Sequence, residues 1–187
     1  MENEQSLSAE GRQRRRLFTH WVARVKQPLN TEGKDVPPIV ARPPQALPEP
    51  LFSAACNGCG DCLNVCPYGL LTLENDKATL NVEFTECDHC TQCTSACRTG
   101  ALRTHMPCDT TLRPQISASC LGRQDSCRIC IISCPQQALS LGQTAQGDRQ
   151  LQCNELQCNG CGLCKLSCFH GHISLAATGE RALPARL

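Results

Sequence analysis

Short apolar runs recur along the chain from residue 70 onward, separated by polar and turn-forming residues. Partial alternation of apolar and polar positions over a few residues is typical of a short strand with one buried face. Seven segments are therefore expected to be strands: 70–73, 79–84, 101–103, 115–117, 138–141, 150–152 and 173–175. No apolar run approaches the roughly 18 residues that a membrane-spanning helix needs, so the sequence predicts no transmembrane segment.

The first 26 residues carry six Lys or Arg against three Glu. From residue 17 on, a helical projection gathers apolar side chains on one face, which predicts a basic amphipathic helix. Those side chains are Leu17, Phe18, Trp21, Val22 and Val25. Such a helix can dock in a groove of a partner protein, fold back on the rest of the chain or lie on an anionic membrane. Docking on a partner is the preferred interpretation.

Residues 36–50 contain six prolines, and this density predicts an extended, polyproline-like linker. Residues 1–50 lack cysteine, whereas the rest of the chain holds all eighteen. The sequence thus indicates an N-terminal segment, residues 1–50, in which a basic amphipathic helix and a Pro-rich linker precede a Cys-rich body.

Sixteen of the eighteen cysteines form four groups, and three groups have the spacing C-x2-C-x2-C-x3-C. The third group is stretched, because six residues separate Cys120 from Cys127 and Gln124 stands where a regular first cysteine would be. Starting positions 56, 87, 124 and 158 give a repeat that advances by 31, 37 and 34 residues. The groups are Cys56-Cys59-Cys62-Cys66, Cys87-Cys90-Cys93-Cys97, Cys120-Cys127-Cys130-Cys134 and Cys158-Cys161-Cys164-Cys168.

Whether these cysteines form disulfides or bind metal depends on the redox state of the compartment. Residues 15–18, Arg-Arg-Leu-Phe, superficially resemble a twin-arginine export signal, but the apolar stretch that such a signal needs does not follow. The sequence therefore predicts a cytoplasmic protein, and in a reducing cytosol thiolate–metal bonds explain eighteen cysteines better than nine disulfides do. Bound metal would also compensate for the scarcity of aromatic residues, six in 187, from which to build an apolar core.

Three thiolates spaced two residues apart wrap around one compact object, and Gly58, Gly60, Gly160 and Gly162 permit the tight backbone that this requires. The spacing favours a cube-shaped [4Fe-4S] cluster over a zinc ion, whose all-cysteine sites usually take two pairs from separate knuckles. Four clusters are expected. Three are the alternative, because the stretched group is the least regular.

In two-cluster ferredoxins the fourth cysteine of each run binds the other cluster. Applied to this chain, that rule pairs the first group with the second and the third with the fourth. The expected ligand sets are Cys56, Cys59, Cys62 and Cys97; Cys87, Cys90, Cys93 and Cys66; Cys120, Cys127, Cys130 and Cys168; and Cys158, Cys161, Cys164 and Cys134.

Each repeat is expected to contain a ligand loop, a short helix near the third and fourth cysteines, and a strand, so that two repeats form one small α+β unit. The predicted fold is therefore α+β, with tandem bacterial 2[4Fe-4S] ferredoxin-like modules behind an irregular or helical N-terminal extension. The first module is expected at residues 51–112 and the second at residues 113–187. Because cluster ligation would replace a large apolar core, the chain without metal is expected to be largely unstructured from residue 51 on.

Two cysteines remain outside this scheme, and three of the five histidines lie in or beside the cysteine groups. Cys108 and Cys153 are expected to be small buried apolar residues, although Cys153, five residues before Cys158, could instead be a spare ligand. His89, His170 and His172 lie in or beside the cysteine groups and are expected to be solvated or hydrogen-bonded rather than ligands.

The formal charge of +1 argues against a dedicated nucleic-acid binder, which needs a clear basic excess. Four oxidised clusters with their thiolates would lower that charge to about −7. The sequence contains no nucleophile motif, phosphate loop or dinucleotide fingerprint, and no carboxylate pair poised for acid-base chemistry. An enzyme is therefore not expected.

The chain resembles the NapF family, the ferredoxin-type proteins encoded with bacterial periplasmic nitrate reductases. The resemblance rests on the Arg-Arg-Arg-Leu-Phe opening with Trp21, the Pro-containing linker, the stretched spacing from Cys120 to Cys127, and the regular fourth group that begins at Cys158. It covers nearly the full length. It implies a cytoplasmic, non-catalytic protein that acts on the nitrate reductase catalytic subunit before export, in maturation or cluster loading.

Two classes of function follow from the sequence. The first is an accessory protein that binds the cytoplasmic precursor of the periplasmic nitrate reductase catalytic subunit and supplies it with electrons or clusters. The second is a general polyferredoxin relay between a reductant and an oxidoreductase, which would not need the N-terminal helix. A zinc-bound interaction module is a third class, if the metal is not iron.

Overall fold

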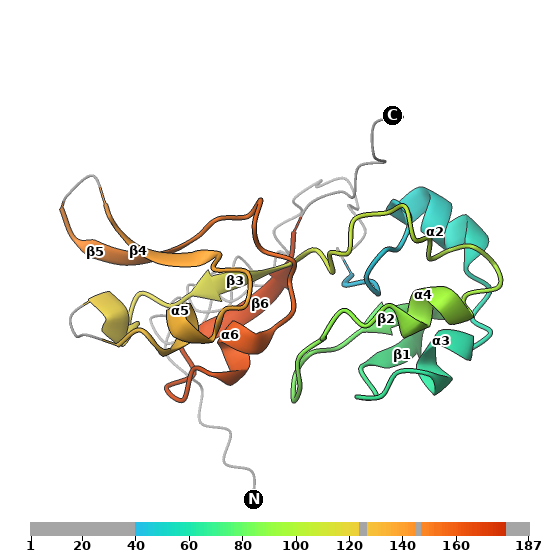
Figure 1. Cartoon of the computed structure of the whole chain (residues 1–187), viewed down its shortest axis with the longest axis horizontal. Helices are drawn as coiled ribbons and strands as arrows, with labels where there is room; N and C mark the ends of the chain where they lie inside the picture. Colours follow the sequence, from blue (N-terminus) through green and yellow to red (C-terminus); the bar gives the residue numbers. More distant parts are fainter. Residues whose placement is uncertain (1–39, 124–126, 145–146, 179–187) are drawn as a thin grey trace, which may run out of the picture. The chain divides into compact units, whose positions relative to one another are not determined.

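The computed structural model of the chain describes residues 40–123, 127–144 and 147–178 (Figure 1). These residues belong to a unit that runs from Ile39 to Leu187. The expected N-terminal helix and the first part of the Pro-rich segment lie outside the described residues. None of the helices in the described ranges is long and apolar enough to cross a membrane.

Two antiparallel hairpins occupy matching places in the first and second halves of the described chain (Figure 1). The first closes through Asn75 and Asp76, which both have positive φ angles, 51° and 56°, as the commonest two-residue hairpin turn requires. The hairpin strands are β1 (Leu71–Glu74), β2 (Lys77–Leu80), β4 (Leu139–Gln143) and β5 (Arg149–Cys153). Residues 79–84 were expected to form one strand, but pairing ends at Leu80.

The outer strands of each half also pair with one another. β3 (Leu112–Ile116) pairs antiparallel with β6 (Ile173–Ala177) in the second half. In the first half this pairing is reduced to a single bridge between Ala46 and Leu102. The described residues therefore combine short helices with antiparallel strand pairs, and the same order of elements occurs twice.

The expectation of an extended linker as far as Pro50 is wrong for its last part. Residues 42–47 are buried, and Ala46 joins the first apolar core through its bridge. The helix α2 (Glu49–Ala55) then begins directly after Pro48. Proline is tolerated in the first turn of a helix because its missing N–H has no partner there, so Pro50 does not prevent this start.

Four one-turn helices lie at the cysteine groups, as the repeat predicts. Each contains the third cysteine of its group and ends before the fourth, so the helical turn separates these two cysteines. They are α3 (Asp61–Asn64), α4 (Gln92–Ala96), α5 (Ile129–Ser133) and α6 (Leu163–Leu166). Gly60 and Gly162 precede α3 and α6 with φ angles of 80° and 92°, which only glycine adopts readily.

The apolar core is divided into three small clusters rather than one. Phe52 is the only aromatic side chain among the core residues of the described chain, and cysteines pack against every cluster. The second cluster joins the two halves, since Leu70 and Leu80 of the first half pack with Leu112 and with Leu175 of the second. Cores this small leave much of the interior to whatever the cysteines bind.

Candidate metal centres

Four cavities lie among the cysteine groups, with about 350, 360, 410 and 370 Å³ not filled by protein atoms. Each is lined by four of the sixteen grouped cysteines. Site 1 has Cys56, Cys59, Cys62 and Cys97; site 2 has Cys66, Cys87, Cys90 and Cys93; site 3 has Cys120, Cys127, Cys130 and Cys168; site 4 has Cys134, Cys158, Cys161 and Cys164. The lining of four grouped cysteines that all four cavities share indicates that one kind of group would fit each of them.

Every cavity takes three cysteines from one loop and the fourth from the other group of the same half. These are the four sets that the crossed rule assigns from the sequence. The crossing arises because each one-turn helix separates the third cysteine from the fourth: Cys62 faces site 1 and Cys66 faces site 2, at the two ends of α3. Binding of clusters by these residues stays a prediction.

The first turn of three ligand loops is fixed by an Asx turn, a feature that the sequence analysis missed. In each, a side-chain oxygen two residues earlier accepts a hydrogen bond from the amide of the second cysteine of the group. The acceptors are Asn57 for Cys59 at 3.2 Å, Asp88 for Cys90 at 3.0 Å and Asn159 for Cys161 at 3.2 Å. The sequence signal is an Asn or Asp directly after the first cysteine, which shapes the turn.

The fourth cysteine of three groups accepts a backbone hydrogen bond at its sulfur. The donors are the amides of Leu70 to Cys66, Leu102 to Cys97 and Ala138 to Cys134, each at 3.4 Å. Amide donors aimed at sulfur stabilise negative charge there, and hydrogen bonds to the sulfurs help set the reduction potential of an iron-sulfur cluster. The arrangement therefore suits thiolate ligands.

Burial works against thiolate formation in the absence of a cation. It raises the pKa of Cys62 to about 11 and the pKa of Cys87 and Cys164 to about 12. Burial also acts to raise the pKa of Cys97, but hydrogen bonds from the Thr99 hydroxyl and from backbone amides outweigh it, and that pKa is lowered. Most of these thiols therefore need a bound metal to become thiolates near neutral pH.

The donor set fits an iron-sulfur cube. All eighteen cysteines lie in the described ranges and none is in a disulfide. No three His, Cys, Asp or Glu side chains of the described residues converge closely enough to hold a single metal ion. The cysteines instead surround a space, as the ligands of a [4Fe-4S] cluster must, whereas zinc would draw four ligands to one point.

The stretched third group also reaches its cavity. The 3-10 turn η1 (Leu121–Arg123) follows Cys120 directly, and Cys127 returns to the same cavity after residues 124–126, which lie outside the described residues. Gly122 is buried where the two ends meet. A Cβ atom there would stand 3.2 Å from the Cys127 carbonyl oxygen and 3.6 Å from the Cys120 sulfur. Glycine at this position lets Cys120 join site 3.

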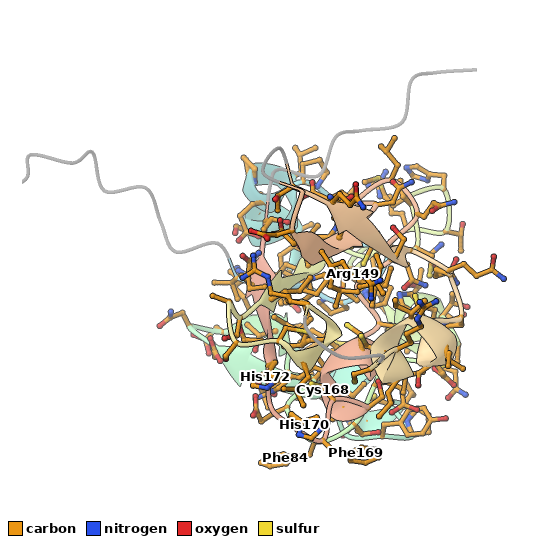
Figure 2. All side chains as sticks on the ribbon, turned by 90° about the vertical axis from the view of Figure 1, so that its left-hand side faces the viewer. Phe84, Arg149, Cys168, Phe169, His170 and His172 are labelled. Carbon is orange, nitrogen blue, oxygen red and sulfur yellow. The ribbon has the colours of Figure 1, made fainter. Side chains whose placement is uncertain are left out.

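The three histidines in or beside the cysteine groups make hydrogen bonds or ring contacts. His89 Nε2 lies 3.2 Å from the Asn159 carbonyl oxygen, and His172 Nδ1 lies 3.2 Å from the Ser119 hydroxyl. The rings of His170 and His172 stack at 5.9 Å between centroids. Figure 2 shows both rings close to Cys168, with Phe169 turned outward beside them; its side chain is exposed.

Comparisons with known proteins agree with this geometry. Two family models, each described as a 4Fe-4S dicluster domain, match residues 55–102 and 125–172. The chain belongs to the ferredoxin-type 4Fe-4S proteins. Two dicluster domains imply [4Fe-4S] clusters, and a count of four fits two clusters in each domain.

Three relatives of this family show how close the similarity is. An uncharacterized protein of Haemophilus influenzae is 44% identical over 72% of this chain and 77% of its own length. The methylamine utilization ferredoxin-type protein MauM of Paracoccus denitrificans is 35% identical over 78% of this chain and 72% of its own. The ferredoxin-type protein NapF of H. influenzae is 34% identical over 68% of this chain and 73% of its own. Because NapF is no more similar than MauM, the comparisons support the ferredoxin-type family without selecting NapF.

Proposed function

We propose that the chain is a non-catalytic electron carrier in which sites 1 to 4 each hold a [4Fe-4S] cluster and together form one path for electrons. The two modules, residues 51–112 and 113–187, would each hold two clusters. Each cluster supplies one-electron transfer, and the sixteen grouped cysteines hold the iron.

The observation that carries this proposal is the contact between sites 2 and 4. The amide of Cys87, in the site 2 loop, donates a hydrogen bond of 2.9 Å to the carbonyl oxygen of Cys161, in the site 4 loop. Within each half, a one-turn helix already joins the two sites. Cys62 in α3 lines site 1, and Cys66, two residues beyond its end, lines site 2. Cys130 in α5 lines site 3, and Cys134 directly after it lines site 4. The order of the path is therefore 1–2–4–3.

Site 3 lies at one end of this path, and the surface beside it suits a redox partner. Phe169 follows the ligand Cys168 and is 83% exposed, and Ile132, in the helix that carries Cys130, is 81% exposed. Exposed apolar side chains next to a redox centre are the kind of surface that a transient protein partner covers.

The first experiment measures iron and acid-labile sulfide in anoxically purified protein, with electron paramagnetic resonance (EPR) spectra before and after dithionite. About sixteen iron atoms per chain, with interacting signals on reduction, support four clusters in two modules. About twelve would remove site 3 from the proposal. Zinc without sulfide would overturn the electron-carrier proposal and favour the zinc-bound interaction module instead.

A second candidate function is specific to one partner: the chain binds the cytoplasmic precursor of the periplasmic nitrate reductase catalytic subunit and assists its maturation. The support is the Arg-Arg-Arg-Leu-Phe opening with Trp21 and the similarity to NapF. A diffusible relay would not need the basic amphipathic helix expected at residues 17–25.

Co-purification separates the two functions. If the chain is an accessory protein, it retains the precursor, and deletion of residues 1–30 abolishes binding while iron content is unchanged. Rapid reduction of an oxidoreductase without a stable complex, unaffected by the deletion, would favour the relay. Detection of the tagged chain in the cytoplasmic fraction tests the proposed compartment in the same cells.

A further inference from the structure

Site 4 differs from the other three sites in its number of sulfurs. Cys153 lines the same cavity as the four cysteines of site 4, so five thiols surround that space. The other three cavities are each lined by four cysteines. The fifth thiol is therefore a property of site 4 rather than of the repeated fold.

The hairpins give Cys153 a counterpart in the first half. Leu71 and Leu139 each lie five residues after the fourth cysteine of their groups, and they pair with Leu80 and Cys153 respectively. Leu80 lines site 2 as Cys153 lines site 4. Because leucine fills the equivalent position without difficulty, packing of the fold does not require a thiol there.

Cys153 is also placed next to one particular ligand. Cys153 and Cys158, the first cysteine of the site 4 loop, line the same cavity. The Arg113 guanidinium donates two hydrogen bonds of 3.0 and 2.6 Å to the Asp109 carboxylate and interacts electrostatically with both sulfurs. The two thiols thus lie in one cavity and interact with the same guanidinium.

We propose that Cys153 is a reserve ligand of site 4, able to take the place of Cys158 on iron. This inference rests on the proposed function, because it requires site 4 to hold a cluster. In the exchange the bond from Cys158 sulfur to iron breaks and a bond from Cys153 sulfur forms. The Cys153 thiol proton passes to the departing Cys158 thiolate, so neither the charge nor the oxidation state changes.

The full-length chain supplies a matched test. Cys158→Ala removes a first-position ligand from site 4, and Cys87→Ala removes the equivalent ligand from site 2, where Leu80 offers no sulfur. Iron and sulfide should stay near sixteen per chain in Cys158→Ala and fall to about twelve in Cys87→Ala. The second substitution Cys153→Val keeps an apolar side chain of similar size. Added to Cys158→Ala, it should lower the iron and sulfide content to about twelve per chain as well. Equal losses in Cys158→Ala and Cys87→Ala would overturn the proposal.

A second measurement does not depend on the folding of a ligand variant. Wild-type protein, Cys153→Val and Cys108→Val, each loaded with iron, are exposed to a chelator while iron release is followed. About four iron atoms should leave Cys153→Val several-fold faster than they leave the wild type, and Cys108→Val should match the wild type. The reserve role fails if Cys153→Val and the wild type release iron at the same rate. A wild-type chain without iron would instead refute the proposed function itself.

Discussion

The amide of Cys87 and the carbonyl oxygen of Cys161 form a 2.9 Å hydrogen bond between two ligand loops that are 74 positions apart in the chain. Two further contacts join the fourth cysteine group to the first half: the Thr110 hydroxyl donates to the Gly160 carbonyl oxygen at 2.7 Å, and Lys165 pairs with Glu83. The site 4 loop is thereby packed against the first half of the chain. Sites 2 and 4 are inner members of the path, and sites 1 and 3 are its ends.

Magnetic coupling between sites 2 and 4 should survive loss of the outer sites. The double variant Cys59→Ala/Cys127→Ala is expected to keep sites 2 and 4 and to show broadened or split EPR signals after full reduction. Cys90→Ala/Cys127→Ala keeps sites 1 and 4 instead and should show weaker interaction, because site 2 no longer lies between them. Equal coupling in the two variants would contradict the order 1–2–4–3.

The close contact at Gly160 should make this position sensitive to a single methyl group. A Cβ atom there would lie 2.1 Å from the Thr110 hydroxyl oxygen and 2.7 Å from the Leu112 carbonyl oxygen, at a φ of +71°. Gly160→Ala is expected to lower the free energy of unfolding by about 2–4 kcal/mol, from overpacking and backbone strain together. Denaturant unfolding of the iron-loaded protein measures this.

Gly69→Ala is the control for that experiment. Gly69 has a similar φ of +62°, but nothing lies within 4 Å of the position that its Cβ would take. Backbone strain alone should lower the free energy of unfolding of this variant by about 1 kcal/mol. If both alanine variants unfold at the same denaturant concentration, the contact of the site 4 loop with Thr110 does not contribute to stability.

Arg42 is expected to anchor the segment that was predicted to be a linker. Its buried guanidinium donates to Glu49 at 3.0 and 2.6 Å and to the Ala78 carbonyl oxygen at 2.9 Å, and it lies 4.8 Å from the centre of the Phe52 ring. Arg42→Met keeps the apolar stem and loses the donors, which should cost about 2 kcal/mol.

Arg103→Met provides the comparison in the same unfolding measurement. Arg103 is exposed and donates to the Gly100 carbonyl oxygen at 3.0 Å, so its loss should change stability by no more than about 0.5 kcal/mol. Equal effects of the two substitutions would mean that the Arg42 contacts do not hold residues 42–49 to the core.

Shared ligand sets can be recognised from double variants. Cys66 and Cys87 line the same cavity although they belong to different groups, whereas Cys56 and Cys66 belong to one group but line different cavities. Cys66→Ala/Cys87→Ala should therefore lose about four iron atoms, and Cys56→Ala/Cys66→Ala about eight. The reverse result would show that each group holds its own cluster and that the crossing is absent.

Removal of iron and sulfide should unfold most of the described chain. Its apolar clusters are small, and burial raises the pKa of Cys87 and Cys164 to about 12, so the thiols are protonated at neutral pH. Binding of iron must release those protons, and reloading should therefore go further as pH rises. Circular dichroism measures the unfolding, and proton release on reloading measures the coupling to pH. An unchanged circular dichroism spectrum after iron removal would contradict the predicted unfolding.

The sequence alone determined the number of ligand groups, their spacing and the repeated order of loop, one-turn helix and strand. These features are local, because in the three regular groups three thiols two residues apart and a fourth beyond one helical turn favour the same backbone. The sequence-based prediction was wrong for residues 42–50, where proline density predicted an extended linker. Arg42 and Ala46 find burial sites that are distant in sequence, at Ala78 and Leu102.

Only the tertiary structure decided which residues meet through space. Spacing made Cys153 an unassigned cysteine, whereas the register of β4 with β5 brings it into the cavity of site 4. The contact of Cys87 with Cys161 likewise has no local signal, since it depends on how the apolar clusters join the two halves. Cysteine spacing thus predicted the four sites, and long-range packing decided the order of the cavities and the extra thiol at one of them.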